Sequence, residues 1–347
     1  MGLVFGTGTA WQLWRSEATR PSITNLPPSY AVRLKGVNWV GSDSLASQDL
    51  EPLMRAHVTW IAQTPFGWQS DAAMPEMRMH TGVGSRSYWG ESDQGLIVTT
   101  RLARQRGIRT LLKPHLWLHG SWPGEIKMNS AADWQAWFAS YSAFLLHYAR
   151  LAEANNMEAL CIGTELQQTV AHEAEWRALI REVRRVYHGQ LTYAANWSGE
   201  FEQVAFWDAL DYIGIQAYFP LSQTERPAKA ALLQAWQEPM RRMIAVQKRF
   251  KKPVVFTEIG YKTTPDAAIK PWMWPDRQAV SSPTDAVTQR VCYEALFETF
   301  WPQPWFGGLF VWKWYPGLQP DGPAHRHLDF TPQHKPAEQV MTSWYSK

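Results

Sequence analysis

Residues 159–165 read ALCIGTE, and residues 253–258 read PVVFTE. Each stretch is a short apolar run with the length and composition of a strand that is buried on both faces. Each run also ends in a glutamate, Glu165 or Glu258. A carboxylate at the end of an apolar strand is costly unless it is hydrogen-bonded or has a function. We therefore interpret the two stretches as buried strands whose C-terminal ends carry chemistry.

Other short apolar runs lie on either side of these two, with longer amphipathic segments between them. This alternation is typical of repeated β-α units. The expected strands are Lys35–Val40, Val58–Pro65, Thr110–Trp117, Ala159–Glu165, Thr192–Trp197, Tyr212–Tyr218, Pro253–Ile259 and Gly308–Trp314. Eight such strands predict an α/β protein, a single closed (β/α)8 TIM barrel. An open doubly wound sheet is the alternative fold, but no G-x-G-x-x-G follows the first strand.

The helices between the strands have recognisable ends. Ser92 and Ser130 each precede a helical stretch, and Gly189 follows one, which is typical of helix starts and a helix stop. Pro239 lies inside the long stretch AKAALLQAWQEPMRRMIAVQKRF, where it predicts a kink or a break.

Composition excludes several classes of protein. The chain has 347 residues, of which 45% are hydrophobic, so a large core is possible and disorder is excluded. A net charge of +3 gives no electrostatic case for a nucleic-acid partner or a polybasic membrane surface. With only two cysteines, a disulfide scaffold is excluded, and Cys161 and Cys292 are expected to be buried small hydrophobes.

Residues 1–30 are interpreted as an N-terminal arm or the remnant of an export segment, and residues 31–347 as one barrel domain. No stretch has the length of a membrane span, and the first residues lack the regions of a signal peptide. The sequence leaves the compartment open: cytoplasmic as written, and periplasmic or secreted if an export segment was removed. It does not fix the oligomeric state either, although a monomer is favoured.

The two glutamates end the fourth and the seventh expected strands, so in a barrel they would face each other across its mouth. A retaining glycosidase needs such a pair. One carboxyl is protonated and donates to the departing oxygen, while the other is ionised and attacks the anomeric carbon, at a separation of about 5–5.5 Å. The alternative is that each glutamate forms an ion pair at the barrel rim.

The segments LKPHLWL, CIGTELQQT, YAANWSG, DYIGIQAYFPL, FTEIGY and VWKWYPG follow one another in this order. As an ordered set they resemble glycoside hydrolase family 113, over about residues 35–318. The resemblance implies a (β/α)8 barrel of the β-mannanase type, a retaining double displacement and no metal or other cofactor. It makes Glu165 the acid/base and Glu258 the nucleophile.

Other site residues follow from strand position together with this resemblance. Tyr218 ends the sixth strand, where its phenol would donate to Glu258. Lys113 and His115 alternate on the third strand and are expected at the barrel mouth. Thr164 stands where many relatives of the wider clan have an asparagine, so Asn196 is the candidate for holding the sugar 2-hydroxyl.

The chain contains 21 tryptophans, and indole rings stack well on the apolar faces of sugars. Trp312 on the eighth strand is the expected platform for the sugar at the cleavage point. The other tryptophans on or next to the loops after strands, which would line a cleft with several sugar subsites, are Trp68, Trp122, Trp197, Trp272 and Trp274. The four expected to fill helix contacts are Trp134, Trp137, Trp176 and Trp236.

The sequence therefore predicts a retaining β-glycoside hydrolase acting on β-mannan or mannooligosaccharides, with an oligo- or polysaccharide as its partner. Two alternatives stay open. Within the same chemistry the substrate could be a β-glucan or an exopolysaccharide. From another class, a noncatalytic carbohydrate-binding barrel would keep the tryptophans, although it would not need both glutamates.

Overall fold

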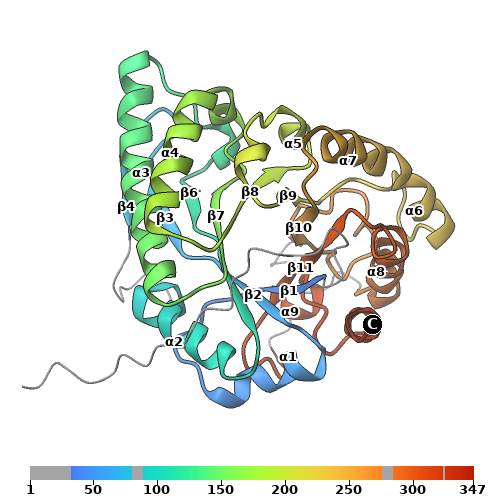
Figure 1. The fold of residues 1–347 in the computed structure, drawn as a ribbon. Coiled ribbons are helices and arrows are strands. Elements are labelled where there is room, and N and C mark those ends of the chain that lie inside the picture. The colour runs from blue at the N-terminus through green and yellow to red at the C-terminus, as the bar shows by residue number, and fades with distance from the viewer. Residues whose placement is uncertain (1–32, 80–88, 276–283, 323–324) are drawn as a thin grey trace, which may run out of the picture.

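A computed structural model describes residues 33–79, 89–275, 284–322 and 325–347. Its central feature is a closed barrel of parallel strands (Figure 1). The order around the barrel is β1 (Leu34–Trp39), β11 (Phe306–Trp314), β10 (Val254–Ile259), β9 (Ile213–Gln216), β8 (Gln190–Asn196), β7 (Ala159–Thr164), β5 (Arg109–Leu112) and β2 (Trp60–Gln63). Each of the expected strand segments overlaps one of these eight, so the barrel prediction is confirmed and the open sheet is wrong. The predicted arm, residues 1–30, lies outside the described residues.

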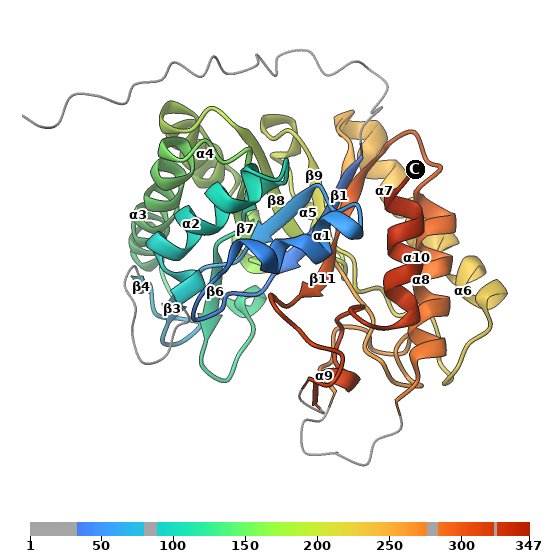
Figure 2. The ribbon, with the colours of Figure 1, turned by 90° about the horizontal axis from the view of Figure 1, so that it is seen from below.

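Helices lie outside the ring of strands, as the second view shows (Figure 2). The α-helices of the described ranges are α1 (Glu51–Arg55), α2 (Asp93–Arg104), α3 (Ala131–Ala154), α4 (Glu173–Val186), α5 (Glu200–Gln203), α6 (Lys229–Ala235), α7 (Gln237–Phe250), α8 (Ala286–Phe300), α9 (His325–Leu328) and α10 (Pro336–Tyr345). Short 3₁₀ turns are η1 (Ser47–Leu50), η2 (Trp89–Glu91), η3 (Pro123–Glu125), η4 (Gln167–Ala171) and η5 (Trp207–Ala209). No helix of the described ranges is long and apolar enough to cross a membrane.

The helix ends follow the local sequence signals. Ser92 and Ser130 cap α2 and α3, since their hydroxyls accept from the backbone N–H of Gly95 and Asp133. The break expected near Pro239 is present, but it falls earlier, at Trp236, between α6 and α7. Pro239 itself lies in the first turn of α7, where a missing N–H is tolerated.

Two barrel strands are shorter than expected because a proline ends each of them. The segments Val58–Pro65 and Thr110–Trp117 were each expected as one strand, but β2 and β5 stop before Pro65 and Pro114. Proline has no N–H to donate to the ladder. The chain then continues into a separate three-stranded sheet of β3 (Phe66–Gln69), β4 (Met77–Met79) and β6 (His115–Leu118).

The core occupies two places. A small cluster fills the barrel interior, where Trp60 meets Phe310 edge to face across the strands. A much larger cluster lies between the strands and the helices. Cys161 and Cys292 are both free and buried, as expected. Trp137, Trp176 and Trp236 are fully buried, while Trp134 is partly buried against the same cluster.

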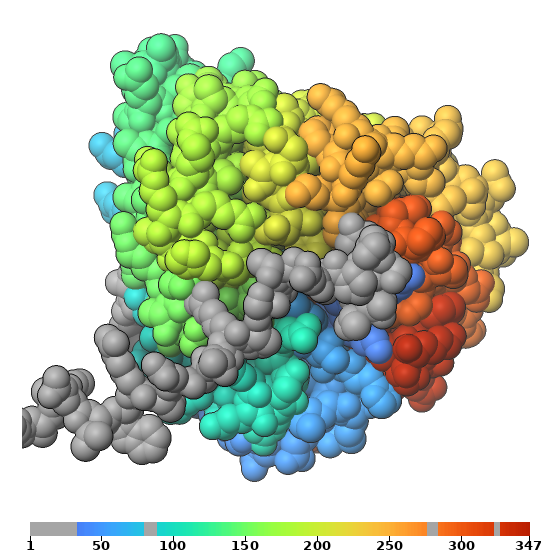
Figure 3. Space-filling model, viewed as in Figure 1, coloured from blue at the N-terminus to red at the C-terminus, as the bar shows by residue number. Residues whose placement is uncertain are grey.

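The first and last described segments meet to close the barrel. The space-filling view shows the blue N-terminal region directly beside the red C-terminal one (Figure 3). Strand β1 pairs with β11, and the Tyr345 hydroxyl of α10 donates to the carbonyl of Gly36 at 2.8 Å. Because all barrel strands run parallel, their C-terminal ends lie at one mouth of the barrel.

Candidate active site

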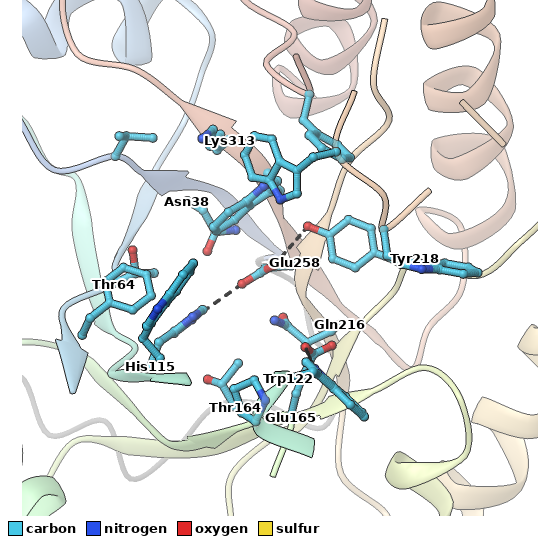
Figure 4. Close-up of a pocket in the computed structure, with 18 of the residues that line it drawn as sticks. Asn38, Thr64, His115, Trp122, Thr164, Glu165, Gln216, Tyr218, Glu258 and Lys313 are labelled. Carbon is cyan, nitrogen blue, oxygen red and sulfur yellow. Dashed lines mark hydrogen bonds and ion pairs between the residues drawn. The ribbon is translucent and has the colours of Figure 1, made fainter. Parts of the chain in front are cut away.

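A cavity of about 980 Å³ opens at the C-terminal ends of the barrel strands. Side chains from most barrel strands reach it, and Figure 4 shows Glu165 and Glu258 pointing into the same space. Glu258 lies on β10, and Glu165 is the residue that directly follows β7. The topology therefore brings together two carboxyls that lie far apart in the sequence.

Glu165 sits on a strained turn at the end of β7. Its φ of 52° lies in the left-handed region, which is uncommon for a residue other than glycine. Its backbone N–H donates to the carbonyl of Ala194 at 2.8 Å. Its two carboxyl oxygens accept from the indole N–H of Trp122 at 2.9 Å and from the side-chain amide of Asn196 at 2.7 Å. Such strain persists only where neighbouring contacts hold it, and it aims the carboxyl into the cavity.

Glu258 lies within β10 and is held by three polar side chains, of which Figure 4 shows Tyr218 and His115. The Lys113 ammonium forms an ion pair with its Oε1. The Tyr218 hydroxyl donates to its Oε2 at 3.0 Å, and the His115 Nε2 lies 3.7 Å from its Oε1. These contacts favour an ionised carboxylate with a fixed orientation.

The two carboxyls differ in acidity for identifiable reasons. Burial and then the Glu258 charge raise the pKa of Glu165 to about 7, against the hydrogen bonds from Trp122 and Asn196. Burial alone would also raise the pKa of Glu258. The ammonium of Lys113, close by and hydrogen-bonded, outweighs that effect and lowers the pKa below its ordinary value. Near neutral pH the pair can therefore hold one proton on Glu165 and one charge on Glu258.

Lys113 and His115 both contact Glu258, but only one of them reaches the cavity. Lys113 is fully buried below the cavity surface, where it also donates to the carbonyl of Thr257 at 3.3 Å. His115 lines the cavity. Burial, and then the Lys113 charge, lower the pKa of His115 to about 3, so the imidazole is neutral.

The tryptophans predicted for the cleft lie in and around the cavity, with one exception. Those that line it are Trp122, Trp197, Trp272, Trp274 and Trp312. Trp197 and Trp272 stack on each other with ring centroids 5.0 Å apart. Trp68 does not line the cavity but lies on β3 beside Trp117, with ring centroids 5.8 Å apart. Trp117 does line the cavity, and half of it is exposed.

Several lining residues were not predicted from the sequence. Asn38 and Gln216 each lie near the end of a barrel strand, so the rule that singled out the glutamates could have found them. Glu91 lies in η2, distant in sequence from the end of any strand. Burial raises its pKa to about 7. The Lys313 ammonium lies 4.3 Å from the ring centre of Trp274, a contact that no sequence pattern indicates.

Asn196 has its side chain occupied at both ends. The amide nitrogen donates to Glu165, and the amide oxygen accepts from the backbone N–H of Ser198 at 2.7 Å. This arrangement holds the side chain against Glu165 at the edge of the cavity. Over the described parts of the chain, no group of three or more histidine, cysteine, aspartate or glutamate side chains is placed to hold a metal ion.

Known structures share this fold. A family 113 β-1,4-mannanase solved as a complex is 28% identical, has a TM-score of 0.77, and the match covers 91% of this chain and 99% of that one. A family 113 β-mannanase from Alicyclobacillus acidocaldarius is also 28% identical, with a TM-score of 0.77 and coverage of 92% and 99%. A β-glucuronidase from Ruminococcus gnavus, at 14% identity, a TM-score of 0.58 and coverage of 90% and 50%, shares the fold alone.

No curated protein matches the chain significantly in sequence. Residues 30–335, however, match the family description Glycoside Hydrolase Family 113. That match spans nearly the whole of the described barrel, including both cavity glutamates. The chain therefore belongs to glycoside hydrolase family 113 and is an enzyme that hydrolyses O-glycosyl bonds.

Proposed function

We propose that this enzyme is a retaining β-mannanase that uses Glu165 as acid/base and Glu258 as nucleophile. The observation that carries the proposal is the opposite acidity of two carboxyls that point into one cavity. A double displacement needs one proton donor and one charged nucleophile at the same anomeric carbon. Glu165 fits the first role and Glu258 fits the second.

In the first step the Glu165 proton passes to the glycosidic oxygen while the Glu258 carboxylate attacks the anomeric carbon. The bond to the leaving sugar breaks, and an ester between the glycone and Glu258 forms. In the second step the Glu165 carboxylate takes a proton from water. The oxygen of that water attacks the anomeric carbon and displaces Glu258, so the released product has the original β configuration.

The same contacts explain how Glu165 changes role between the steps. The negative charge of Glu258 raises the pKa of Glu165, and ester formation removes that charge. The pKa of Glu165 therefore falls once the ester has formed, and a carboxylate that can accept a proton replaces the acid. Deglycosylation then restores the Glu258 charge and with it the acid form of Glu165.

The surrounding side chains divide into two supporting sets. Lys113 and Tyr218 keep Glu258 ionised and aimed, while Trp122 and Asn196 keep Glu165 directed into the cavity. Asn196 thus orients the acid/base, and its predicted contact to the sugar 2-hydroxyl stays a prediction. His115 lines the cavity, and its expected contact to the sugar likewise stays a prediction.

The choice of β-mannan rests on the similar enzymes and on the aromatic cleft. Both 28% identical structures are described as β-mannanases. The lining tryptophans, Trp312 at the cleavage point among them, offer faces on which successive pyranose rings can stack. Another β-glycan, such as a β-glucan or an exopolysaccharide, remains the second candidate, because the same catalytic pair would serve it.

Two measurements test the proposal. Incubation with mannan, glucomannan, cellulose and their oligosaccharides should show the highest kcat/KM on the mannose-based substrates. A proton NMR time course on mannopentaose should show the β-anomer of the product first, before mutarotation. An α-anomer formed first would contradict the double displacement, and binding of sugar without any product would favour a noncatalytic barrel.

A further inference from the structure

Glu200, the first residue of α5, is a fully buried carboxyl outside the cavity lining. Its Oε1 accepts from the hydroxyl of Tyr193, and its Oε2 accepts from the backbone N–H of Asn196 at 2.5 Å. A buried carboxylate is expensive, and an apolar residue could fill the same space without that cost. The presence of a carboxyl here therefore calls for a functional reason.

Both partners of Glu200 lead to Glu165. The Tyr193 hydroxyl accepts from the backbone N–H of Leu166 at 2.9 Å, and Leu166 directly follows the strained Glu165. Asn196 donates its side-chain amide to the Glu165 carboxyl. Glu200 is thus linked to the backbone next to Glu165 through Tyr193. It is linked to the Glu165 carboxyl through Asn196, whose backbone N–H binds Glu200 and whose side-chain amide binds Glu165.

The two donors favour a carboxyl group at this position. A phenol O–H and a backbone N–H converge on the two oxygens of Glu200, and a carboxylate accepts from both. A glutamine would present its NH₂ group to one of them. Because the Tyr193 hydroxyl also receives the Leu166 N–H, its own proton has to point toward Glu200. The hydrogen-bond directions are therefore consistent from Leu166 through Tyr193 to Glu200.

We propose that Glu200 is a positioning residue for the acid/base. Through Tyr193 it holds the strained backbone turn at Glu165, and through Asn196 it fixes the orientation of the Glu165 carboxyl. This inference rests on the proposed function, since it assigns a role within the same catalytic step. Glu200 touches no substrate. It acts by limiting the backbone and side-chain motion of Glu165 during proton transfer.

The carboxyl of Glu200 also lies close enough to Glu165 for their ionisations to be coupled. Burial, and then the Glu165 charge, raise the pKa of Glu200 to about 8, against the hydrogen bonds from Tyr193 and Asn196. The groups facing Glu200 are Tyr193 from β8 and Glu165 after β7, while Arg242 from α7 is paired with Glu202. Because the pKa of Glu165 is about 7, Glu165 ionises first, and replacing Glu200 by glutamine should leave the alkaline limb near pH 7.

Two variants test the inference on mannopentaose. Glu200→Gln replaces one acceptor oxygen by a donor, and Tyr193→Phe cuts the connection to Leu166. Both should lower kcat about 10-fold or more, part of the effect of a general acid, with little change in KM. Neither should move the alkaline limb of kcat/KM clearly, because Glu200 is still protonated while Glu165 titrates. On a 2,4-dinitrophenyl β-mannobioside, whose leaving group needs no proton, both variants should lose less activity in the glycosylation step.

Tyr187→Phe is the matched control. Its hydroxyl is buried and donates to the carbonyl of Met157 at 2.8 Å, before β7 begins and so at the opposite end of the barrel. It should lower the melting temperature about as much as Tyr193→Phe while leaving kcat and the pH profile unchanged. Circular dichroism and thermal unfolding show whether each variant is folded, and Tyr193→Phe carries the test if Glu200→Gln is not.

The inference is overturned if the folded Glu200 and Tyr193 variants behave like the control, with lower stability but wild-type kcat on mannopentaose and on the dinitrophenyl substrate. The proposed function fails separately, and visibly, if the wild-type enzyme releases no product from any β-glycan. In that case the assigned role of Glu200 falls with it.

Discussion

At the residue scale, Glu258 combines a chemical role with a structural one. Its carboxylate is the partner of the fully buried Lys113, so any substitution there leaves an ammonium without a counter-charge in the barrel. Removing one member of a buried ion pair costs about 3–5 kcal/mol. Catalysis and stability are therefore coupled at this position.

Glu258→Ala should abolish turnover, by at least about 10³-fold, while sugar binding stays nearly intact. It should also lower the melting temperature, because Lys113 loses its partner. Glu258→Gln, which keeps the shape and one acceptor, should be equally inactive but more stable than the alanine variant. Steady-state kinetics, calorimetric titration with mannotetraose and thermal unfolding separate these effects, and a variant that remains active would make the nucleophile assignment wrong.

The acidity of Glu165 predicts the alkaline side of the pH profile. General acid catalysis requires the protonated form, and the pKa of Glu165 is about 7, so kcat/KM should fall as pH rises through about 7. The acid limb should lie below pH 4.5, because the pKa of Glu258 is lowered from that value and Glu258 must be ionised to attack. Glu165→Gln should remove the alkaline limb together with most of the activity. An unchanged limb in the residual activity would assign that ionisation to another group, with Glu91 as the next candidate.

At the scale of elements, the small β3–β4–β6 sheet extends the cavity sideways. In its register Phe66 pairs with His115 and Trp68 with Trp117, so these four side chains share one face. His115, Phe66 and Trp117 line the cavity, and Trp68 continues the row beyond it. Since β3 and β6 directly follow the prolines that end β2 and β5, the aromatic row begins at the catalytic centre and runs outward.

Trp117→Ala should therefore lower kcat/KM for long mannooligosaccharides about 10-fold and leave that for the shortest hydrolysed substrate almost unchanged. The reason is the loss of one stacking surface away from the cleavage point. Met79→Ala is the matched control, because Met79 on β4 pairs with Gly67 and points to the opposite face of the sheet. Kinetics on a series from mannotriose to mannohexaose measure the difference, and an equal loss at every chain length would argue against a remote subsite.

At the scale of the whole molecule, one cooperative barrel depends on the contact between its two ends. Tyr345 of α10 is fully buried, and its hydroxyl donates to the carbonyls of Gly36 and Leu309. Nearby, the Arg33 guanidinium donates to the carbonyls of Trp301, Gln303 and Phe306. These bonds join β1 to the last part of the chain, where the ring of strands closes.

Tyr345→Phe should destabilise the protein by about 1–2 kcal/mol, because it leaves buried carbonyls without a donor. It should not change kcat or the pH limbs, since the bonds lie away from the cavity. Urea unfolding followed by fluorescence and by circular dichroism should give one coincident transition in both wild type and variant. Two separate transitions would contradict a single cooperative domain over the described residues.

The sequence by itself determined the order and approximate position of the barrel strands and the two glutamates at strand ends. These features depend on local patterns, because the apolar runs, the caps at Ser92 and Ser130 and the prolines act within a few residues. The same patterns predicted most of the cavity tryptophans. They also predicted Trp68 at the cavity, which is wrong. They predicted β5 and β6 as one strand, because the apolar run continues through Pro114, which interrupts the hydrogen-bonded ladder.

Only the tertiary structure decided which charged and polar side chains contact each other. Lys113 meets Glu258 across 145 positions of sequence, and Asn196 at the end of β8 and Trp122 before η3 both reach Glu165. The pKa values depend on burial and on these partners, and neither is encoded in local periodicity. The Glu200 network likewise exists only because β7 and β8 pair in parallel, which brings their C-terminal ends side by side.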